Sequence, residues 1–300
     1  MKRLLLLCIT IVLVVSLAAC GLGEPERQKK TTKKGQMKIG EMMQENKRHV
    51  WLLGKYMNTE KVNGKNEIHR VLVSKNGKYQ TYYFRDMENG TVDDLTKMSD
   101  DEIIKKAKKE DKSMFNYEKK KLIELTNGEI KETEKLMKQG DDYKAPPTTK
   151  SKLVVYGYSD YAQDDGSASP EESMKKLKKY KKELESSEYK EPENKKIDLQ
   201  YDDNDLMLAV ARNYPFPKNS VAHKDVIDDR GLKYLMVQQA LQPKNYNGQR
   251  MAGVAEDGDT ERGEAEFDFL LTKVDKNVKN VLIDEKDDPA IKANKPKKDN

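Results

Sequence analysis

The chain carries two cysteine thiols, and their positions predict different fates. Cys8 lies inside an apolar stretch over residues 4–15 that follows two basic residues. Cys20 comes directly after small residues, in the sequence LAAC at 17–20. A basic amino-terminal region, an apolar core and a cleavage site of small residues are typical of a secretory signal peptide, which is removed. We therefore expect cleavage between Ala19 and Cys20, which would leave Cys20 at the new amino terminus.

The LAAC sequence resembles the bacterial lipobox, in which the cysteine thiol accepts diacylglycerol through a thioether. This resemblance implies S-diacylglycerol and N-palmitoyl groups on Cys20. The alternative is a plain secreted protein with one free thiol. Two or three acyl chains exceed the roughly two signals that stable membrane attachment needs. The apolar stretch itself is shorter than the roughly 20 residues of a membrane-spanning helix. With Cys8 removed, the mature chain would have no cysteine pair and no thiol for catalysis.

Other residues that could do chemistry show no catalytic spacing. The three histidines are His49, His69 and His223, and the first two lie in strand-like patterns. For these two histidines, a position on the surface of a strand is a simpler interpretation than a role as a metal ligand. The sequence has no HExxH, no GxSxG and no Walker-type phosphate loop. Paired carboxylates stay open as catalysts, because acidic residues are so frequent that their spacing carries no information. We expect no catalytic residue, cofactor or metal ligand.

Two acidic loops, 160–172 and 256–264, contain carboxylates that could bind calcium. In the first loop, Gly166 can be aligned with the EF-hand glycine, but Tyr161 and Gln163 then occupy ligand positions. The second loop has no recognised ligand spacing. An ordinary solvated turn is the simpler interpretation of both loops.

Two basic segments could contact anionic partners. Residues 174–184 (MKKLKKYKKEL) place lysines around one apolar stripe of a helix. That face could bind acidic polysaccharide, anionic lipid or an acidic host protein, although a merely soluble helix face is the simpler interpretation. Residues 21–38 contain little that could pack and are rich in basic residues, which predicts a disordered tether. The tether could bind anionic lipid headgroups through its basic residues, or it could act only as a solvated linker.

The overall charge does not indicate a nucleic-acid-binding protein. The chain has 57 basic and 52 acidic residues, a net charge of +5. Loss of Lys2 and Arg3 with the signal would reduce this to +3, since 5 − 2 = 3. Charged residues make up 36% of the chain, and the mean hydropathy is −0.95. Apolar residues must therefore be used economically, in alternating strands and one-sided helices.

Strand and turn patterns dominate the first half. Residues 49–56 (HVWLLGKY) predict a strand. Residues 67–74 and 78–85 predict a β-hairpin, because Asn76 and Gly77 tolerate the positive φ of a tight turn. Further along, a capping box over 99–102 predicts the start of a short amphipathic helix.

A second Asn-Gly pair, at 127 and 128, predicts a turn between short strands within 119–133. Two prolines then mark a linker at 145–151. Residue Ser169, as a cap before Pro170, predicts a helix over 170–186. The other expected elements are a strand at 152–158, a short helix within 205–217, a helix or strand at 230–241, and strands at 264–274 and 277–284.

Hairpins outnumber strand-helix-strand crossovers, so the sequence predicts an α+β fold of antiparallel sheet with a few packed amphipathic helices. The predicted organisation is a signal peptide (1–19), lipidated Cys20 with a disordered basic tether (20–45), an N-terminal α+β half (46–144), a linker (145–151), a C-terminal α+β half of similar size (152–284) and a disordered polar tail (285–300).

Several segments resemble, in their order, the staphylococcal tandem lipoproteins. These segments are the lipobox, the strand of Trp51 followed by VLVSKNGKY (71–79), KKKLIELTNGEI (119–130), DLQYDDNDLMLAVARNYPFP (198–217) and GEAEFDFLLT (263–272). The resemblance implies a non-enzymatic surface protein of a Gram-positive bacterium, linked to host-cell entry and to inflammatory recognition of its lipid. Cys20 is the one functional residue that it transfers.

The leading hypothesis is a lipoprotein on the extracellular face of the cell membrane that acts by contact with host or envelope partners, with its lipid a ligand for innate receptors. A solute-binding lipoprotein of a transporter is the alternative. It would need a ligand cleft, commonly between two α/β lobes, and the hairpin-rich pattern argues against one. An envelope hydrolase is a third possibility.

Overall fold

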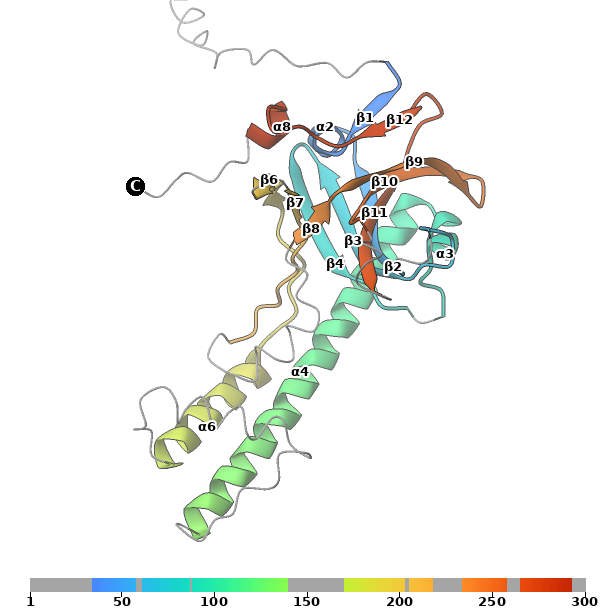
Figure 1. Ribbon diagram of the computed structural model, residues 1–300. Coiled ribbons are helices and arrows are strands. Elements are labelled where there is room, and N and C mark those ends of the chain that lie inside the picture. The colour runs from blue at the N-terminus through green and yellow to red at the C-terminus, as the bar shows by residue number, and fades with distance from the viewer. Residues whose placement is uncertain are drawn as a thin grey trace, which may run out of the picture.

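The computed structural model describes residues 34–57, 61–86, 88–139, 170–202, 205–217, 234–257 and 265–292. A seven-stranded antiparallel sheet lies at its centre, in the order β5-β4-β3-β2-β11-β10-β9 (Figure 1). Its strands are β2 (His49–Met57), β3 (Ile68–Lys75), β4 (Lys78–Tyr83), β5 (Lys195–Lys196), β9 (Gln239–Tyr246), β10 (Gln249–Ala255) and β11 (Glu266–Lys273). The fold is therefore α+β, as predicted.

Smaller elements surround this sheet. Strands β6 (Leu199–Asp202), β7 (Asp205–Ala209) and β8 (Tyr234–Val237) form a three-stranded antiparallel sheet, and β1 (Gln36–Lys38) pairs in parallel with β12 (Asn280–Leu282). The helices are α2 (Ile39–Gln44), α3 (Val92–Thr96), α4 (Asp100–Gln139), α6 (Pro170–Ser186) and α8 (Pro289–Lys292). Figure 1 shows β1, α2, β12 and α8 at one end of the molecule, while α4 and α6 project together from the opposite end.

The central strands are apolar on both sides because both faces of the sheet are covered. Along β2, Trp51 and Leu53 point into a core shared with the three-stranded sheet and with α2. The alternating residues Val50 and Leu52 point into a second core, which includes residues of α3 and the start of α4. A strand has a side-chain period of two, so continuous burial requires cover on both faces.

The predicted hairpin over 67–85 is confirmed. Asn76 and Gly77 have φ values of 53° and 69°, the positive values that a two-residue turn requires. The backbone N–H groups of the turn also donate to α2 and to the residue after it, Asn76 to the carbonyl of Glu45 and Gly77 to that of Met43. The capping box is likewise present, since the Ser99 hydroxyl accepts from the Glu102 N–H, and the Glu102 carboxylate accepts from the Ser99 N–H.

The prediction of short strands within 119–133 is wrong, because α4 continues without a break through Asn127 and Gly128. Leu122 and Thr126 lie one helical turn apart and are both buried. The Thr126 hydroxyl donates to the Leu122 carbonyl at 2.7 Å. The burial of one helical face outweighs the turn preference of the Asn-Gly pair.

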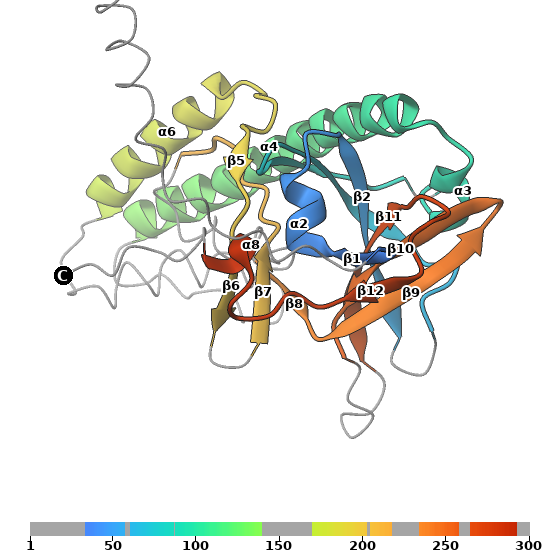
Figure 2. The ribbon, with the colours of Figure 1, turned by 90° about the horizontal axis from the view of Figure 1, so that it is seen from above.

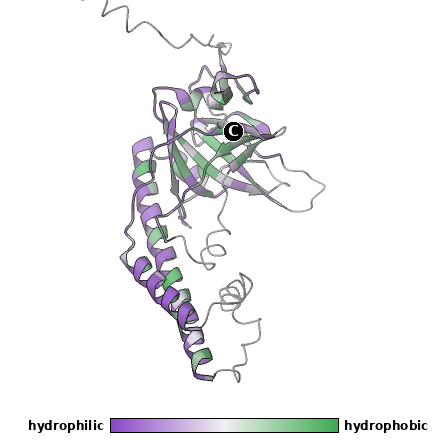
Figure 3. Ribbon diagram, turned by 90° about the vertical axis from the view of Figure 1, so that its left-hand side faces the viewer, coloured by the Kyte–Doolittle hydropathy of each residue, from purple (hydrophilic) through white to green (hydrophobic). Residues whose placement is uncertain are grey.

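Helix α6 covers that face of α4, and the two helices form an arm (Figures 1 and 2). Its bounds, Pro170–Ser186, confirm the predicted helix, and Met174, Tyr180 and Leu184 are its buried residues. Figure 3 shows that most of the arm is hydrophilic, with scattered apolar positions. At 40 residues, α4 has a length of about 60 Å.

The short helix predicted within 205–217 is also wrong. Residues 205–209 form strand β7, in which Leu206 and Leu208 are buried and their neighbours are not. This period of two places one side of the strand on the core of the central sheet. The ambiguous segment 230–241 contributes strands β8 and β9, and the two predicted late strands correspond to β11 and β12.

Strands from both predicted halves form the central sheet, so the described residues do not divide into two separate halves. Strand β2 pairs with β3 on one side and with β11 on the other. The predicted linker at 145–151 and the predicted strand at 152–158 lie outside the described residues.

Both predicted disordered segments extend too far into the folded body. Residues 36–44 form β1 and α2, where Ile39 and Met43 are each 1% exposed. At the other end, Ala290 and Ile291 of α8 are buried as well. These few apolar side chains order segments that look polar overall, because they pack on one another and on the three-stranded sheet.

Candidate functional site

The predicted lipid-bearing residue, Cys20, and the predicted cleavage position between Ala19 and Cys20 lie outside the described part of the chain. The structure does describe the place where the chain from Cys20 enters the body. There Lys38 of β1 forms an ion pair of 2.6 Å with Asp288, and both side chains are nearly inaccessible to solvent. The Gly40 N–H donates to both carboxylate oxygens of Asp284, at 3.2 and 3.0 Å. Burial raises the pKa of Asp284 to about 6. Buried polar contacts therefore fasten residues 38–40 to residues 284–288.

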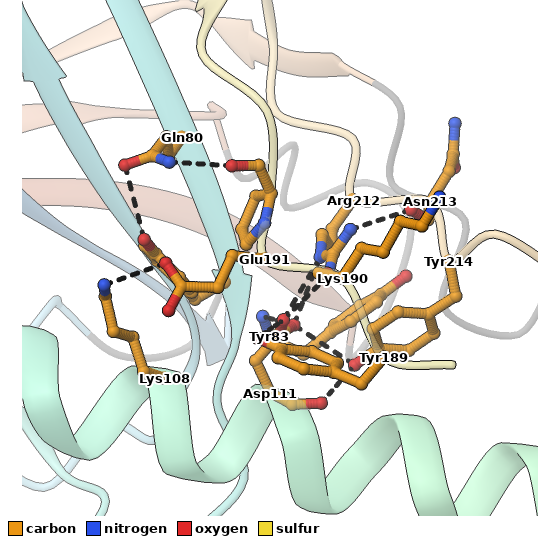
Figure 4. Close-up of polar contacts among 12 residues, drawn as sticks. Gln80, Tyr83, Lys108, Asp111, Tyr189, Lys190, Glu191, Arg212, Asn213 and Tyr214 are labelled. Carbon is orange, nitrogen blue, oxygen red and sulfur yellow. Dashed lines mark hydrogen bonds and ion pairs between the residues drawn. The ribbon is translucent and has the colours of Figure 1, made fainter.

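A second polar cluster joins the arm to the sheet (Figure 4). Its centre is Asp111 of α4, which is fully buried and faces Arg212, a residue of the segment after β7. The Arg212 guanidinium donates to Asp111 Oδ2 through Nη2 at 2.9 Å and through Nε at 3.3 Å. The remaining guanidinium nitrogen donates to the Asn213 carbonyl. The hydrogen bond and charge of Asp111 outweigh the burial of Arg212, so the pKa of Arg212 is raised.

Three further donors satisfy the Asp111 carboxylate. Tyr83 of β4 donates its backbone N–H to Oδ1 at 2.9 Å, Tyr214 its hydroxyl to the same oxygen at 3.1 Å, and Tyr189 its hydroxyl to Oδ2 at 2.9 Å. Burial, followed by the negative charge of Asp111, raises the pKa of both tyrosine hydroxyls. A carboxylate with this many donors is a structural anchor for the elements around it, and its lone pairs are occupied.

The segment after α6 passes between α4 and β4, as Figure 4 shows. Lys108 of α4 forms an ion pair of 2.8 Å with Glu191, and Gln80 of β4 donates its amide to the Pro192 carbonyl at 2.7 Å. These contacts supplement the Asp111 cluster and hold the base of the arm against strand β4, next to the edge strand β5.

A third cluster contains two titratable groups with buried atoms that lack a hydrogen bond in the described structure. His69 is the extra residue of a β-bulge between β2 and β3, opposite Gly54. Its Nε2 lies 3.3 Å from Oδ1 of Asp268 on β11. Within the described structure, His69 Nδ1 and Asp268 Oδ1 are buried without a hydrogen bond. An added side chain at Gly54 would collide with the Glu67 carbonyl and the Phe269 ring, which accounts for the glycine.

Burial favours the neutral form of both partners in this pair. It lowers the pKa of His69 to about 3, and the charges of Arg70 and Lys55 act in the same direction. It raises the pKa of Asp268 to about 7, helped by the nearby charge of Glu256. Between about pH 3 and pH 7 the His69 imidazole is therefore neutral, and the Asp268 carboxyl group keeps its acidic proton. The histidine was visible in the sequence, but nothing near it in the chain indicated Asp268.

The other two histidines and the two acidic loops do not contribute a side chain to this pair within the described residues. His49 is buried and contacts Glu45 through Nε2 at 2.8 Å, whereas His223 lies outside the described residues. Of the two acidic loops, 170–172 and 256–257 are described. Glu256 there accepts the backbone N–H of Asp268 at 3.0 Å, an ordinary strand-end contact.

One group of carboxylates among the described residues has the spacing of a possible cation site. Glu285, Asp287 and Asp288 place one oxygen each within 4.8 Å of the others. Lys38 and the backbone N–H of Glu285 already bind Asp288 Oδ2, both at 2.6 Å. Asp288 of this group is therefore already part of the contact with Lys38 of β1.

No helix in the described ranges is both long enough and apolar enough to cross a membrane. Comparisons with protein-family models, with curated proteins and with solved structures gave no match. The resemblance to the staphylococcal tandem lipoproteins therefore stays a prediction from the sequence.

Proposed function

We propose that this protein is a lipoprotein held by acylated Cys20 on the extracellular face of a bacterial cell membrane, where it acts by contact with host or envelope partners. The observation that carries the proposal is the sequence LAAC at 17–20, directly after a basic and apolar signal. The lipid itself is part of the proposed activity, as a ligand for innate immune receptors.

The arrangement of the described elements supports a position in which the arm points away from the membrane and is accessible to partners. The chain from Cys20 enters at β1, and the arm of α4 and α6 projects from the other end (Figure 1). Residues 21–35 can span at most about 50 Å when fully extended. This tether would place the β1 end toward the membrane and leave the arm available to partners in the surroundings.

The polar clusters support a contact function over catalysis. The Asp111 carboxylate is occupied by donors from four other residues, and it fixes the arm to the sheet. The pair of His69 and Asp268 lies between strands of the sheet, at a bulge. The first arrangement has an evident structural role, because it joins α4 to the segments packed on it.

Cys20→Ala in the full precursor tests the anchor, with Cys8→Ala as the matched control because both remove one thiol. Membrane fractions and detergent-phase partitioning would be compared with the wild type. We expect Cys20→Ala to leave the detergent phase and to be shed or mislocalised, while Cys8→Ala stays membrane-bound. Unchanged membrane retention of Cys20→Ala would contradict the proposal.

A further inference from the structure

The lysines of α6 differ in their surroundings. Lys176, Lys179 and Lys181 each lie 3.7–3.9 Å from a glutamate four residues away. Lys175, Lys178 and Lys182 are exposed and have no carboxylate within 4.0 Å in the part of the chain that the structure describes. We call these three residues the lysine stripe.

The lysine stripe lies on the face of α6 that points away from α4. The buried residues Met174, Tyr180 and Leu184 face the other helix. Spacings of three and four residues place the stripe lysines on one side of the helix, with rises of about 4.5 and 6 Å between them. The result is a short row of positive charges on the outside of the arm.

We propose that the lysine stripe binds a linear anionic polysaccharide. A row of unneutralised ammonium groups at regular intervals complements a chain with repeated carboxylate or sulfate groups. Lysine suits this task because its ammonium group is a compact, hydrated point charge on a flexible stem. The proposal rests on the proposed contact function and names the class of partner.

Two other partners fit the geometry less well. An anionic membrane surface would lie toward β1, whereas the arm projects from the opposite end of the body (Figure 1). A folded acidic protein would need apolar or aromatic anchors within its contact area. Within the described residues, the exposed large apolar side chains are Tyr117 and Met137, and both belong to α4.

The test measures binding of the detergent-purified full mature protein to heparin, a linear anionic polysaccharide, at 50 and 200 mM salt. The stripe variant is Lys175→Gln, Lys178→Gln and Lys182→Gln. The matched control, Lys135→Gln, Lys176→Gln and Lys181→Gln, removes the same charge from the same arm at lysines that already lie near glutamates. Glutamine and lysine have similar helix propensities. A Lys→Arg version of the stripe variant retains the charge.

We expect wild-type binding to weaken with salt, because screening shortens the reach of exposed charges. The stripe variant should bind about tenfold more weakly at 50 mM salt, the control within about threefold of wild type, and the arginine variant like the wild type. Equal weakening by both glutamine variants would overturn the proposal. So would stronger binding to polyglutamate or to anionic vesicles than to heparin. The assay does not depend on the lipid anchor, so its failure would leave the anchoring proposal standing.

Discussion

Asp111 and Arg212 lie 101 residues apart in the sequence and form an ion pair of 2.9 Å whose side chains are 0% and 6% exposed. Their contact joins the first third of α4 to the segment that follows β7. Tyr83 and Tyr189 donate to the same carboxylate, so four segments of the chain meet at one side chain. We therefore expect the direction in which the arm leaves the body to depend on this contact.

Asp111→Ala should therefore destabilise the protein strongly. Removing one partner of a buried ion pair leaves the other charge uncompensated, at a cost of about 3–5 kcal/mol in the free energy of unfolding. Denaturant unfolding would measure the loss. The control is Asp101→Ala, which removes a short but exposed ion pair of 2.7 Å with Arg48 and should cost about 0–1 kcal/mol. Equal losses for the two variants would show that Asp111 does not hold the arm.

Gly128→Ala should stabilise the protein by about 0.5–1 kcal/mol, because alanine is favoured over glycine inside a helix. A Cβ at Gly128 meets no atom within 4 Å. If Asn127 and Gly128 instead formed a tight turn with positive φ, the same change would destabilise the protein. The sign of the shift in the unfolding midpoint distinguishes the helix from the turn.

Gly40→Ala should have the opposite effect. A Cβ there would approach Ala290 Cβ to 2.6 Å and Asp284 Oδ1 to 2.7 Å, closer than real contacts allow. We expect a loss of about 1–3 kcal/mol in the free energy of unfolding, as for other overpacked sites. Proteolysis should then cut more readily near α2 or α8. A variant as stable as wild type would mean that α2 does not pack on residues 284–290 as described.

The shifted pKa values of His69 and Asp268 should make two opposite contributions to the pH dependence of the free energy of unfolding. The raised pKa of Asp268, about 7, gives stability that is full below the unfolded value of 3.8 and is lost as the pH rises to 7. The lowered pKa of His69, about 3, gives stability that is full above the unfolded value of 6.5 and is lost as the pH falls. Between pH 4 and 6.5 these two contributions oppose each other.

Each single variant should expose the contribution of the other residue. His69→Gln should make the free energy of unfolding fall as the pH rises from 4 to 7, relative to wild type. Asp268→Asn should make it fall as the pH decreases below 6.5. Urea unfolding across this range would measure both slopes, and slopes of the same sign would refute the assignment.

Local signals in the sequence predicted local structure well. The turn at Asn76 and Gly77 and the capping box at Ser99 depend on residues a few positions apart, and both are present. The same Asn-Gly signal failed at 127–128, because burial of Leu122 against the second helix of the arm decides the structure there. Contacts distant in sequence outweighed the local preference.

The polar clusters could not be predicted for a related reason. Acidic and basic residues are so frequent that no pattern in the neighbouring sequence distinguishes Asp111 or Arg212 from the others. Only the fold brings the two residues together. The partner of His69 is likewise set by strand order, since β2 stands between β3 and β11. The lysines of α6 were visible as a group, but which of them are paired became clear only from the helix geometry.

The mass of the amino-terminal peptide, from protein isolated from the bacterial membrane, tests the central claim most directly. We predict a peptide that begins at Cys20 and carries diacylglycerol on the sulfur and an acyl group on the amino nitrogen. A peptide that begins elsewhere, or a Cys20 without fatty acids, would contradict the proposed anchor and the function built on it.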